Sequence, residues 1–398
     1  MIWSFRVGTI AGIPVKFDIT FLLILPVFGW VIGLQVAELI ALLNLALGAN
    51  IDPEPLTTAQ WPWILGFIAA VGLFAGVILH ELGHSLIAIR YGYPISSITL
   101  WLLGGVAQLE RPPRDWRHEL WIAIAGPIVS VLVGVGCYLL LLITPAAFPS
   151  IRFIFGYLAL MNVVLAVFNM LPGFPMDGGR VLRALLARNR SFVVATQQAA
   201  EIGKIFAIGM GLLGLIWLNL LLIALAFFIY IAATGESRQI LLESMFEGVT
   251  VDDVMTSEAE LHTVSPDMSI EELLQFMFKH RHLGYPVLDR NELTGVVTFD
   301  DIRTIAPSDR GSKTVRDVMA TELITIGPDK QAIEALHEMH RRNVGRLLVV
   351  DATGDLLGLV SRTDLVRALS FLQAAGSGQF SGSSDAIGVT DDQTAIRR

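Results

Sequence analysis

The sequence is poor in cysteine and in charge. Cys137 is the only cysteine among 398 residues, so no disulfide can form within the chain. Charged residues make up 16% of the chain, below the quarter or so that is typical of soluble domains, while hydrophobic residues make up 54%. The chain does not open on a short apolar segment followed by a small-residue cleavage site, so we expect its N-terminus to be retained. This composition indicates a membrane protein without disulfides.

Charge is also distributed unevenly along the chain. Residues 1–245 contain 13 Lys and Arg against 12 Asp and Glu, a balance of +1. Residues 246–398 contain 15 against 24, a balance of −9, and the two parts sum to the net charge of −8. An apolar, nearly neutral part is therefore followed by an acidic part of soluble composition, with a boundary expected near 234–247. We expect no nucleic-acid partner.

Apolar runs in the first part are long enough to cross a bilayer, which takes about 20 helical residues. The alternating stretch 2–17 contains Gly-Ile-Pro and predicts a short hairpin before them. Within the fifth run, Glu201 and Lys204 are three residues apart and predict a surface ion pair. The six predicted spans lie near 19–38, 62–90, 119–143, 152–171, 194–215 and 217–234.

Basic residues orient these spans. Arg6 and Lys16 precede the first span, and further arginines follow the second, fourth and sixth spans. The opposite loops, 50–60 and 144–151, contain no Lys or Arg. The positive-inside rule then places the N- and C-termini in the cytoplasm, which an even number of spans requires.

The segment between the second and third predicted spans has a different character. It reads ISSITLWLLGGVAQLE at 95–110, is rich in strand-forming residues, and is interrupted by Gly104 and Gly105. It is too short to cross the bilayer as a helix. A re-entrant or membrane-edge hairpin fits, because non-helical backbone at membrane depth is tolerated only where protein or water satisfies its hydrogen bonds.

The second predicted span contains three ionisable residues, His80, Glu81 and His84, in the pattern H-E-x-x-H. On a helix, residues i and i+4 share one face, so both imidazoles can reach one metal ion. Glu81 is offset by one residue and can instead address a water molecule at the metal as a general base. A catalytic zinc typically has three protein ligands, so the pattern predicts a zinc site that needs one more.

Two residues compete as the third ligand. His118 lies in RPPRDWRHE, a charged stretch typical of a solvated membrane edge. Asp177 lies in NMLPGFPMDGGRVLR at 169–183, where prolines and glycines break the helix and can turn the chain back toward the histidines. An Asp between Gly and Pro is ordinarily a turn residue. Beside an H-E-x-x-H helix, however, Asp177 is the better candidate.

HELGH at 80–84 together with NMLPGFPMDGG at 169–179 resembles the site-2 protease family of intramembrane zinc metalloproteases, over about residues 1–235. The resemblance implies one Zn²⁺ per chain and Glu81 as the catalytic residue. It also implies hydrolysis of a peptide bond in or near a transmembrane segment of a membrane-bound substrate, as in regulated intramembrane proteolysis. The zinc ligands that it implies are His80, His84 and Asp177.

The resemblance extends to substrate contacts. LLGGVAQ at 102–108, with Gly104 and Gly105, is similar to a family hairpin that holds the substrate as an added strand. Asn169 matches a family asparagine that is a candidate to hydrogen-bond the unwound substrate.

Two positions depart from the family pattern. AGPIVS at 125–130 matches a third-span motif, but Ser130 stands where an asparagine is expected. Met176 stands where a leucine is usual before the aspartate. These departures leave the zinc ligands unchanged and concern the substrate contacts of the third span.

The acidic part contains an internal repeat. VDDVM at 251–255 matches VRDVM at 315–319, and GVVTFDDI at 295–302 matches GLVSRTDL at 358–365. Each copy predicts a helix, at 270–281 and 331–342, followed by a strand, at 285–289 and 347–351. The remaining stretch is rich in Gly, Ser, Asp and Gln, and predicts a disordered tail.

The repeat resembles a tandem pair of cystathionine-β-synthase-type (CBS) domains over about 246–371, a family that binds adenosine nucleotides between its copies. Hydroxyls in its recurring pattern suit phosphate and carboxylates suit ribose. The matching nucleotide-binding candidates are Thr298, Asp301, Ser361 and Asp364. The alternative is that these residues form capping boxes for helices that start at Phe299 and Arg362, and the two roles are compatible. ATP, ADP or AMP as a regulatory ligand and a homodimer through the CBS pair are both open.

These features predict a polytopic α-helical membrane protein with about six transmembrane helices and short membrane-edge β-hairpins, followed by an α/β tandem CBS-domain module. The expected partners are the lipid bilayer and a transmembrane protein substrate. The competing functions are a CBS-gated membrane transporter or channel, with the H-E-x-x-H residues as an ion pathway, and a catalytically inactive scaffold. The absence of an inverted repeat argues against the transporter, and the intact Glu81 against the scaffold. The predicted domains are a metalloprotease domain at 1–240, CBS domains at 246–308 and 312–371, and a disordered tail at 373–398.

Overall fold

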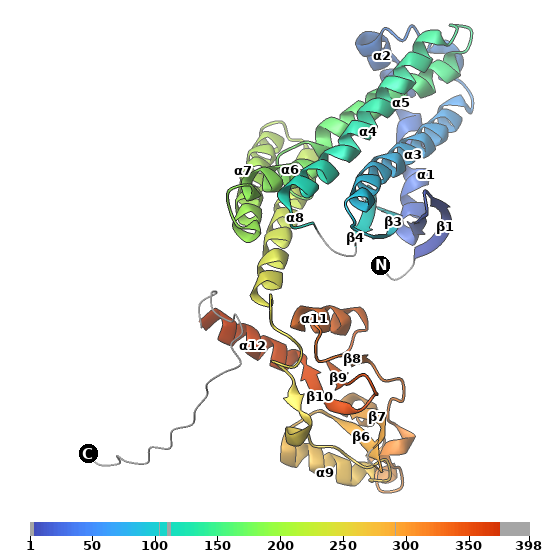
Figure 1. The fold of residues 1–398 in the computed structure, drawn as a ribbon. Helices are drawn as coiled ribbons and strands as arrows, with labels where there is room; N and C mark the ends of the chain where they lie inside the picture. Colours follow the sequence, from blue (N-terminus) through green and yellow to red (C-terminus); the bar gives the residue numbers. More distant parts are fainter. Residues whose placement is uncertain (1–3, 103, 110–112, 291, 375–398) are drawn as a thin grey trace. The chain divides into compact units, whose positions relative to one another are not determined.

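The computed structural model describes residues 4–102, 104–109, 113–290 and 292–374. The chain divides into two compact units, Met1–Ile240 and Leu241–Arg398. The division falls inside the boundary region expected at 234–247. Figure 1 traces the first unit from blue to yellow and the second from yellow to red.

Helices form most of the first unit (Figure 1). Asp115 begins one of them by accepting hydrogen bonds from the backbone N–H groups of Arg117 and His118. The bond from Arg117 lowers the pKa of Asp115 below its ordinary value. The helices are α1 (Ile19–Leu34), α2 (Val36–Leu47), α3 (Trp61–Arg90), α4 (Trp116–Ile143), α5 (Pro149–Asn169), α6 (Asp177–Ala187), α7 (Phe192–Ile216) and α8 (Leu220–Met245), with a 3-10 turn η1 (Glu54–Leu56).

Five of the described helices, α3, α4, α5, α7 and α8, are long and apolar enough to cross a membrane. Helices α1 and α2 pass the same test together, but they are bent by 71°, so there are up to six spans. The predicted first span, 19–38, is therefore wrong as one straight helix. At Gln35 the backbone leaves the helical conformation, with φ −110° and ψ 13°, and its N–H bonds to the Ile32 carbonyl.

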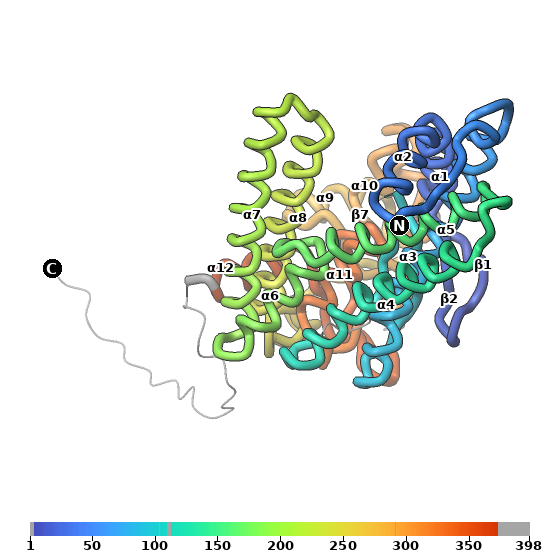
Figure 2. Tube along the Cα trace, turned by 90° about the horizontal axis from the view of Figure 1, so that it is seen from above, coloured from blue at the N-terminus to red at the C-terminus, as the bar shows by residue number. Residues whose placement is uncertain are grey.

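Helices α3, α4 and α5 lie side by side along much of their length (Figures 1 and 2). Buried apolar side chains such as Leu65, Leu141 and Phe153 fill the space between them and α2. Large apolar side chains are exposed on the outer faces, including Leu132 and Ile205. A helix that is apolar all round fits a lipid environment rather than water.

A four-stranded sheet packs against the start of the bundle in the order β1–β2–β3–β4. Both predicted hairpins are present in it. Ala11 and Gly12 connect the first pair, and both have positive φ, as a two-residue hairpin turn requires. Strands β2 and β3 pair in parallel. Strand β4 is the last in the order of the sheet, so it lies at one edge. The strands are β1 (Ser4–Ile10), β2 (Ile13–Asp18), β3 (Ile95–Trp101) and β4 (Gly104–Leu109).

The predicted helix break after the fourth span is present. Helix α5 ends at Asn169, and residues 170–176 form a loop that contains two prolines. Phe174 of this loop is buried against alanines of α7 and α8, which anchors the loop. Helix α6, which begins at Asp177, was not predicted. Its buried side, which includes Asp177 and Arg183, packs against the bundle.

The second unit contains the predicted repeat. One sheet has the order β5–β10–β9–β8 and the other consists of β6 and β7. The predicted helices at 270–281 and 331–342 are present as α9 and α11, and each copy has its own apolar core. The elements are β5 (Thr256–Ser257), η2 (Glu258–Glu260), α9 (Ile270–His280), β6 (Gly284–Asp289), β7 (Glu292–Thr298), α10 (Phe299–Ile302), η3 (Pro307–Asp309), η4 (Val315–Asp317), β8 (Thr325–Ile326), α11 (Ala332–Arg341), β9 (Arg346–Val350), β10 (Leu356–Ser361) and α12 (Arg362–Ala374).

The predicted disordered tail at 373–398 concerns the end of the chain. The tail was predicted to begin at 373, whereas α12 runs to Ala374. Residues 375–398 lie outside the described residues.

Candidate metal centre

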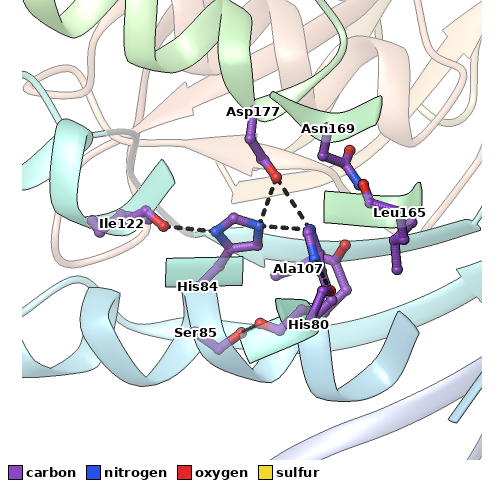
Figure 3. A network of polar contacts seen from close by, with 10 residues as sticks. His80, His84, Ser85, Ala107, Ile122, Leu165, Asn169 and Asp177 are labelled. Carbon is purple, nitrogen blue, oxygen red and sulfur yellow. Dashed lines mark hydrogen bonds and ion pairs between the residues drawn. The ribbon is translucent and has the colours of Figure 1, made fainter. Parts of the chain in front are cut away.

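Three buried side chains converge where α3 meets the start of α6 (Figure 3). His80 Nε2 and His84 Nε2 each lie 3.1 Å from Asp177 Oδ2, and the two nitrogens lie 3.1 Å from each other. The three side chains are 4%, 6% and 10% exposed. Among the described residues they form the one group of His, Cys, Asp and Glu side chains with metal-site spacing. The fold therefore brings together the three residues that the sequence singled out as ligands.

The other ring nitrogen of each histidine contacts α4. His84 Nδ1 donates to the Ile122 carbonyl at 2.7 Å, and a carbonyl can only accept. In a neutral His84 the proton is therefore on Nδ1, which leaves the Nε2 lone pair facing the other two donor atoms. His80 Nδ1 lies 2.9 Å from the Ser130 hydroxyl. The carbonyl contact fixes both the ring orientation and the tautomer of His84. The hydroxyl contact fixes the ring orientation of His80, since a hydroxyl can either donate or accept.

The donor set fits a tetrahedral zinc ion. Zinc bonds to nitrogen and oxygen are about 2.0–2.1 Å long, so tetrahedral donor atoms are separated by about 3.3 Å. The observed separations of 3.1 Å are close to this value. Two imidazoles and one carboxylate also leave the fourth position of such a site open, as a catalytic zinc requires.

One face of α4 packs against the two histidines of this centre. Ile122, Gly126 and Ser130 recur along it at helical spacing, and each lies against one of the two histidines. The backbone of α4 comes very near the His84 ring at Gly126, where an added Cβ would lie 2.2 Å from His84 Nε2. Only glycine leaves room for the imidazole here, so α4 shapes the space in which the donor atoms meet.

Glu81 lies on α3 next to His80 and is half-buried. Its Oε2 atom accepts a hydrogen bond of 3.1 Å from the backbone N–H of Ala107 in β4. A Cβ on Gly105 would lie 2.6 Å from Glu81 Cγ, so the absence of a side chain lets the strand approach α3. The sheet edge and the carboxylate are thus in direct contact.

His118, the competing third ligand, lies elsewhere. Its ring stacks on Tyr91 with centroids 4.2 Å apart, and its Nδ1 lies 3.1 Å from the Tyr93 hydroxyl. It is absent from the buried donor group. These aromatic contacts account for the residue without a metal.

Comparisons with known proteins show the family of the chain. The family model described as peptidase family M50 matches residues 68–150 and 144–212, and the CBS domain model matches 251–307 and 315–371. A protein named as a zinc metalloprotease of Methanocaldococcus jannaschii is 38% identical over 378 residues, which cover 94% of this chain and 98% of that protein. This chain belongs to the site-2 protease family of zinc metalloproteases. A solved structure of a site-2 protease from the same organism is 35% identical, covers 59% of this chain and 95% of the other, and has a TM-score of 0.40.

The site-2 protease assignment decides between the competing functions. The chain is a multi-pass membrane enzyme, a zinc metalloprotease with a tandem CBS pair. The transporter or channel alternative and the inactive scaffold are therefore not retained.

The substrate-contact residues carried over from the site-2 protease resemblance lie close to the metal centre. Asn169, at the end of α5, stands beside the donor group in Figure 3, and its amide donates to the Leu165 carbonyl at 3.0 Å. Gly104 and Gly105 begin β4. Ser130 differs from the expectation: its hydroxyl faces His80.

The nucleotide candidates are only partly together. A cleft of about 440 Å³ in the second unit is lined by Thr298 and Asp301, but Ser361 and Asp364 are not among its lining residues. Both pairs also form the expected capping contacts, with hydroxyl–carboxylate distances of 2.6 Å. A volume of this size falls in the range of small-ligand sites.

Arg346 is a lining residue of this cleft that the sequence pattern did not single out. It begins β9 at the position that Gly284 occupies in the first repeat. A Cβ on Gly284 would collide with its guanidinium, so the glycine makes room for it. Burial lowers the pKa of the Arg346 guanidinium, and the nearby Asp301 and Asp364 act in the opposite direction.

Sequence reasoning did not recognise the role of the residues that support the donor atoms, although the AGPIVS motif at 125–130 contains Gly126 and Ser130. The recurrence of Ile122, Gly126 and Ser130 along one face of α4 is visible in the sequence, but so are many other helical stripes. What identifies this stripe is its partner helix, which only the fold provides.

We expect Gly126→Ala to weaken zinc binding by about 10- to 100-fold, because the added methyl group displaces the His84 imidazole from the donor position. Zinc affinity of the purified enzyme, measured by competition with a chelator, checks this. Gly136→Ala on the same helix is the matched control, since its Cβ would meet nothing within 4 Å. Equal zinc affinity in the two variants would contradict the steric role of Gly126.

Proposed function

We propose that His80, His84 and Asp177 hold the zinc ion and that Glu81 is the catalytic base of peptide-bond hydrolysis. The three buried donor atoms converge at 3.1 Å, and two of them lie on the helix that also carries Glu81, which supports this assignment. Zinc at this position supplies Lewis acidity, which polarises the scissile carbonyl and increases the acidity of water.

Glu81 has the chemistry to move protons at this site. Its carboxylate is adjacent to His80 but is held by the Ala107 N–H. A carboxylate at the mouth of the site can take a proton from the attacking water and return it to the leaving amine nitrogen. The Ala107 N–H orients the carboxylate during this exchange, because a single hydrogen bond fixes which oxygen faces the substrate.

The substrate is proposed to bind as an extended strand along the free edge of β4. Backbone groups of an antiparallel strand alternate between its two sides, so the N–H of Gly105 points the same way as that of Ala107, away from β3. A substrate strand on this edge satisfies the backbone groups that it exposes when it unwinds. Asn169 is proposed to hydrogen-bond the same strand from α5.

The substrate class follows from the surroundings of the site. The donor atoms lie among helices that are long and apolar enough to cross a membrane. The peptide bond is therefore proposed to lie in or near a transmembrane segment, as in regulated intramembrane proteolysis. Both termini are proposed to face the cytoplasm because of the arginine-rich loops, and labelling of a cysteine introduced in residues 375–398 from either side of the membrane tests this.

The cleft in the second unit is proposed to bind an adenine nucleotide that modulates proteolysis. Thr298, Asp301 and Arg346 line it, which supplies a hydroxyl, a carboxylate and a half-buried cation. A guanidinium suits phosphate oxygens, and a carboxylate suits ribose hydroxyls. The same module is proposed to join two chains through exposed apolar residues such as Phe278, which is 90% exposed, and sedimentation of the solubilised enzyme tests this.

Glu81→Gln should retain zinc and lose cleavage, because the amide cannot accept the proton although it preserves the shape of the side chain. Asp177→Asn and His80→Ala should lose zinc as well. Metal analysis and cleavage of a reconstituted membrane substrate measure both quantities. Cleavage by Glu81→Gln at the native rate would reject it as the base, and a native zinc content in Asp177→Asn would reject it as a ligand.

Ala107→Pro should slow cleavage of a transmembrane substrate by 10-fold or more, since it removes the N–H that holds the Glu81 carboxylate; we take about 10-fold as the effect of one lost hydrogen bond. Ala107→Val retains the N–H and serves as the control, with unchanged zinc content expected in both variants. Equal cleavage rates in the two variants would show that the Ala107 N–H does not orient Glu81.

Arg346→Gln should weaken the binding of AMP, ADP or ATP by 10-fold or more, because a charge-assisted hydrogen bond to phosphate contributes roughly 1.5–3 kcal/mol. Calorimetry on the full-length enzyme measures this. Arg316→Gln is a matched control, since Arg316 pairs with Asp267 and Asp289 outside the cleft. No detectable binding of the three nucleotides to the native enzyme, with cleavage unaffected by them, would rule out nucleotide control.

A further inference from the structure

A buried arginine joins several elements around the helix that begins with Asp177. Arg183 of α6 is 5% exposed. Its Nε donates to Glu119 Oε1 of α4 at 2.6 Å, and its other arm donates to Glu236 Oε1 of α8 at 2.7 Å. The guanidinium also lies over two aromatic rings, 5.0 Å from the centroid of Phe174 and 4.8 Å from that of Phe192. One side chain thus contacts α4, α7, α8 and the loop before Asp177.

These contacts are directional rather than merely apolar. A guanidinium is planar, and its donors have a fixed fork geometry, so carboxylates on two sides and rings above its plane fix its orientation. Burying an ion pair contributes little net stability compared with apolar packing. Loss of one partner, however, leaves a buried charge unpaired. The cluster is therefore better explained by the position it enforces than by the stability it adds.

Arg183 and Asp177 are both buried residues of α6. Asp177 is the first residue of this short helix, so small rotations or shifts of α6 move its carboxylate directly. Arg183 also packs on Phe174, which lies in the loop just before Asp177. The two ends of the Asp177 segment are therefore held by one guanidinium.

The bond between Arg183 and Glu119 fixes the position of α6 relative to α4, the helix that orients the histidines. Glu119 is one turn before Ile122 on α4, and Ile122 accepts the hydrogen bond from His84. Figure 1 shows the first turns of α4 beside α6. The same helix, α4, thereby positions both kinds of donor. It contacts the His84 imidazole through Ile122, and it is connected to the helix of the Asp177 carboxylate through Arg183.

The bond between Arg183 and Glu236 connects α6 to α8. The Glu236 side chain is 33% exposed, so its bond to Arg183 is the more accessible of the two. Helix α8 continues without a break to Met245, and the next residue, Phe246, is buried in the core of the second unit. The helix that carries Glu236 is therefore the one that connects covalently to the CBS pair.

We propose that Arg183 is a positioning residue for Asp177, and that its bond to Glu236 makes the zinc affinity of the active site depend on α8. The proposal rests on the role of Asp177 as a zinc ligand. In this arrangement Arg183 does not touch the metal or the substrate; it acts by holding α6 in register with α4 and α8.

The test measures zinc affinity in the full-length, solubilised enzyme by competition with a chelator, together with the melting temperature of the metal-free enzyme. Arg183→Gln should weaken zinc binding about 10-fold or more, as is typical for the loss of a residue that orients a ligand. Arg183→Lys should recover part of this loss because it retains the charge but not the fork. Glu236→Gln should weaken zinc binding several-fold, in the same direction.

A matched control removes a carboxylate from an ion pair elsewhere in the same unit. Glu201 bonds to Lys204 at 2.8 Å on α7, and Glu201→Gln should leave the zinc affinity unchanged. The melting temperature of metal-free Glu236→Gln should match that of this control, and saturating zinc should restore its cleavage rate. A purely structural role would lower the melting temperature and leave the affinity of the folded fraction unchanged.

The outcomes separate this proposal from the ligand assignment. If Arg183→Gln does not fold, Glu236→Gln and Arg183→Lys still decide the question. Zinc affinity in Glu236→Gln and Arg183→Lys equal to that of Glu201→Gln overturns the positioning role. If Asp177→Asn also retains native zinc affinity, the ligand assignment itself has failed; if it loses zinc, only the role of Arg183 is rejected.

Discussion

Three possible metal-donor atoms lie 3.1 Å apart in a buried site, and this arrangement constrains the rest of the first unit. Lone pairs on two imidazole nitrogens and a carboxylate oxygen repel one another unless a metal ion or a shared proton lies between them. The fold must therefore hold the three side chains in place for the metal. Several directional contacts do this. A carbonyl and a hydroxyl face the outer nitrogens of the histidines, and Arg183, on the helix that begins with Asp177, pairs with Glu119 of α4.

Helix α4 is the common reference for these contacts. It contributes no atom to the donor set, yet it contacts both histidines and pairs with the helix of Asp177 through Glu119. Ser130 illustrates the consequence. As a departure from the family motif it suggested altered substrate contacts, but its hydroxyl faces His80. A hydroxyl and an amide can both partner an imidazole nitrogen, so this substitution preserves the chemistry of the position.

The sheet brings a second constraint, which concerns the substrate rather than the metal. Strand β4 lies close enough to α3 for its backbone to bond with Glu81, and the glycine at 105 permits that approach. An edge strand exposes unpaired backbone groups, which is a liability in most proteins. Next to a protease site the same exposed groups can bind an unwound peptide. The contact between β4 and Glu81, the proposed base, then sets the distance of that peptide from the metal centre.

The sequence alone indicated the two halves of the chain, the repeat, the hairpins and the three candidate donor residues. These follow from composition, periodicity and spacing, which are local properties. His80 and His84 share a helix face by helical geometry, and Pro and Gly break the chain before Asp177. The bend at Gln35, helix α6 and the roles of Gly126, Ser130 and Arg183 depended on the tertiary structure. Each is defined by a partner on another element, and a sequence specifies such partners only through the packing that brings them together.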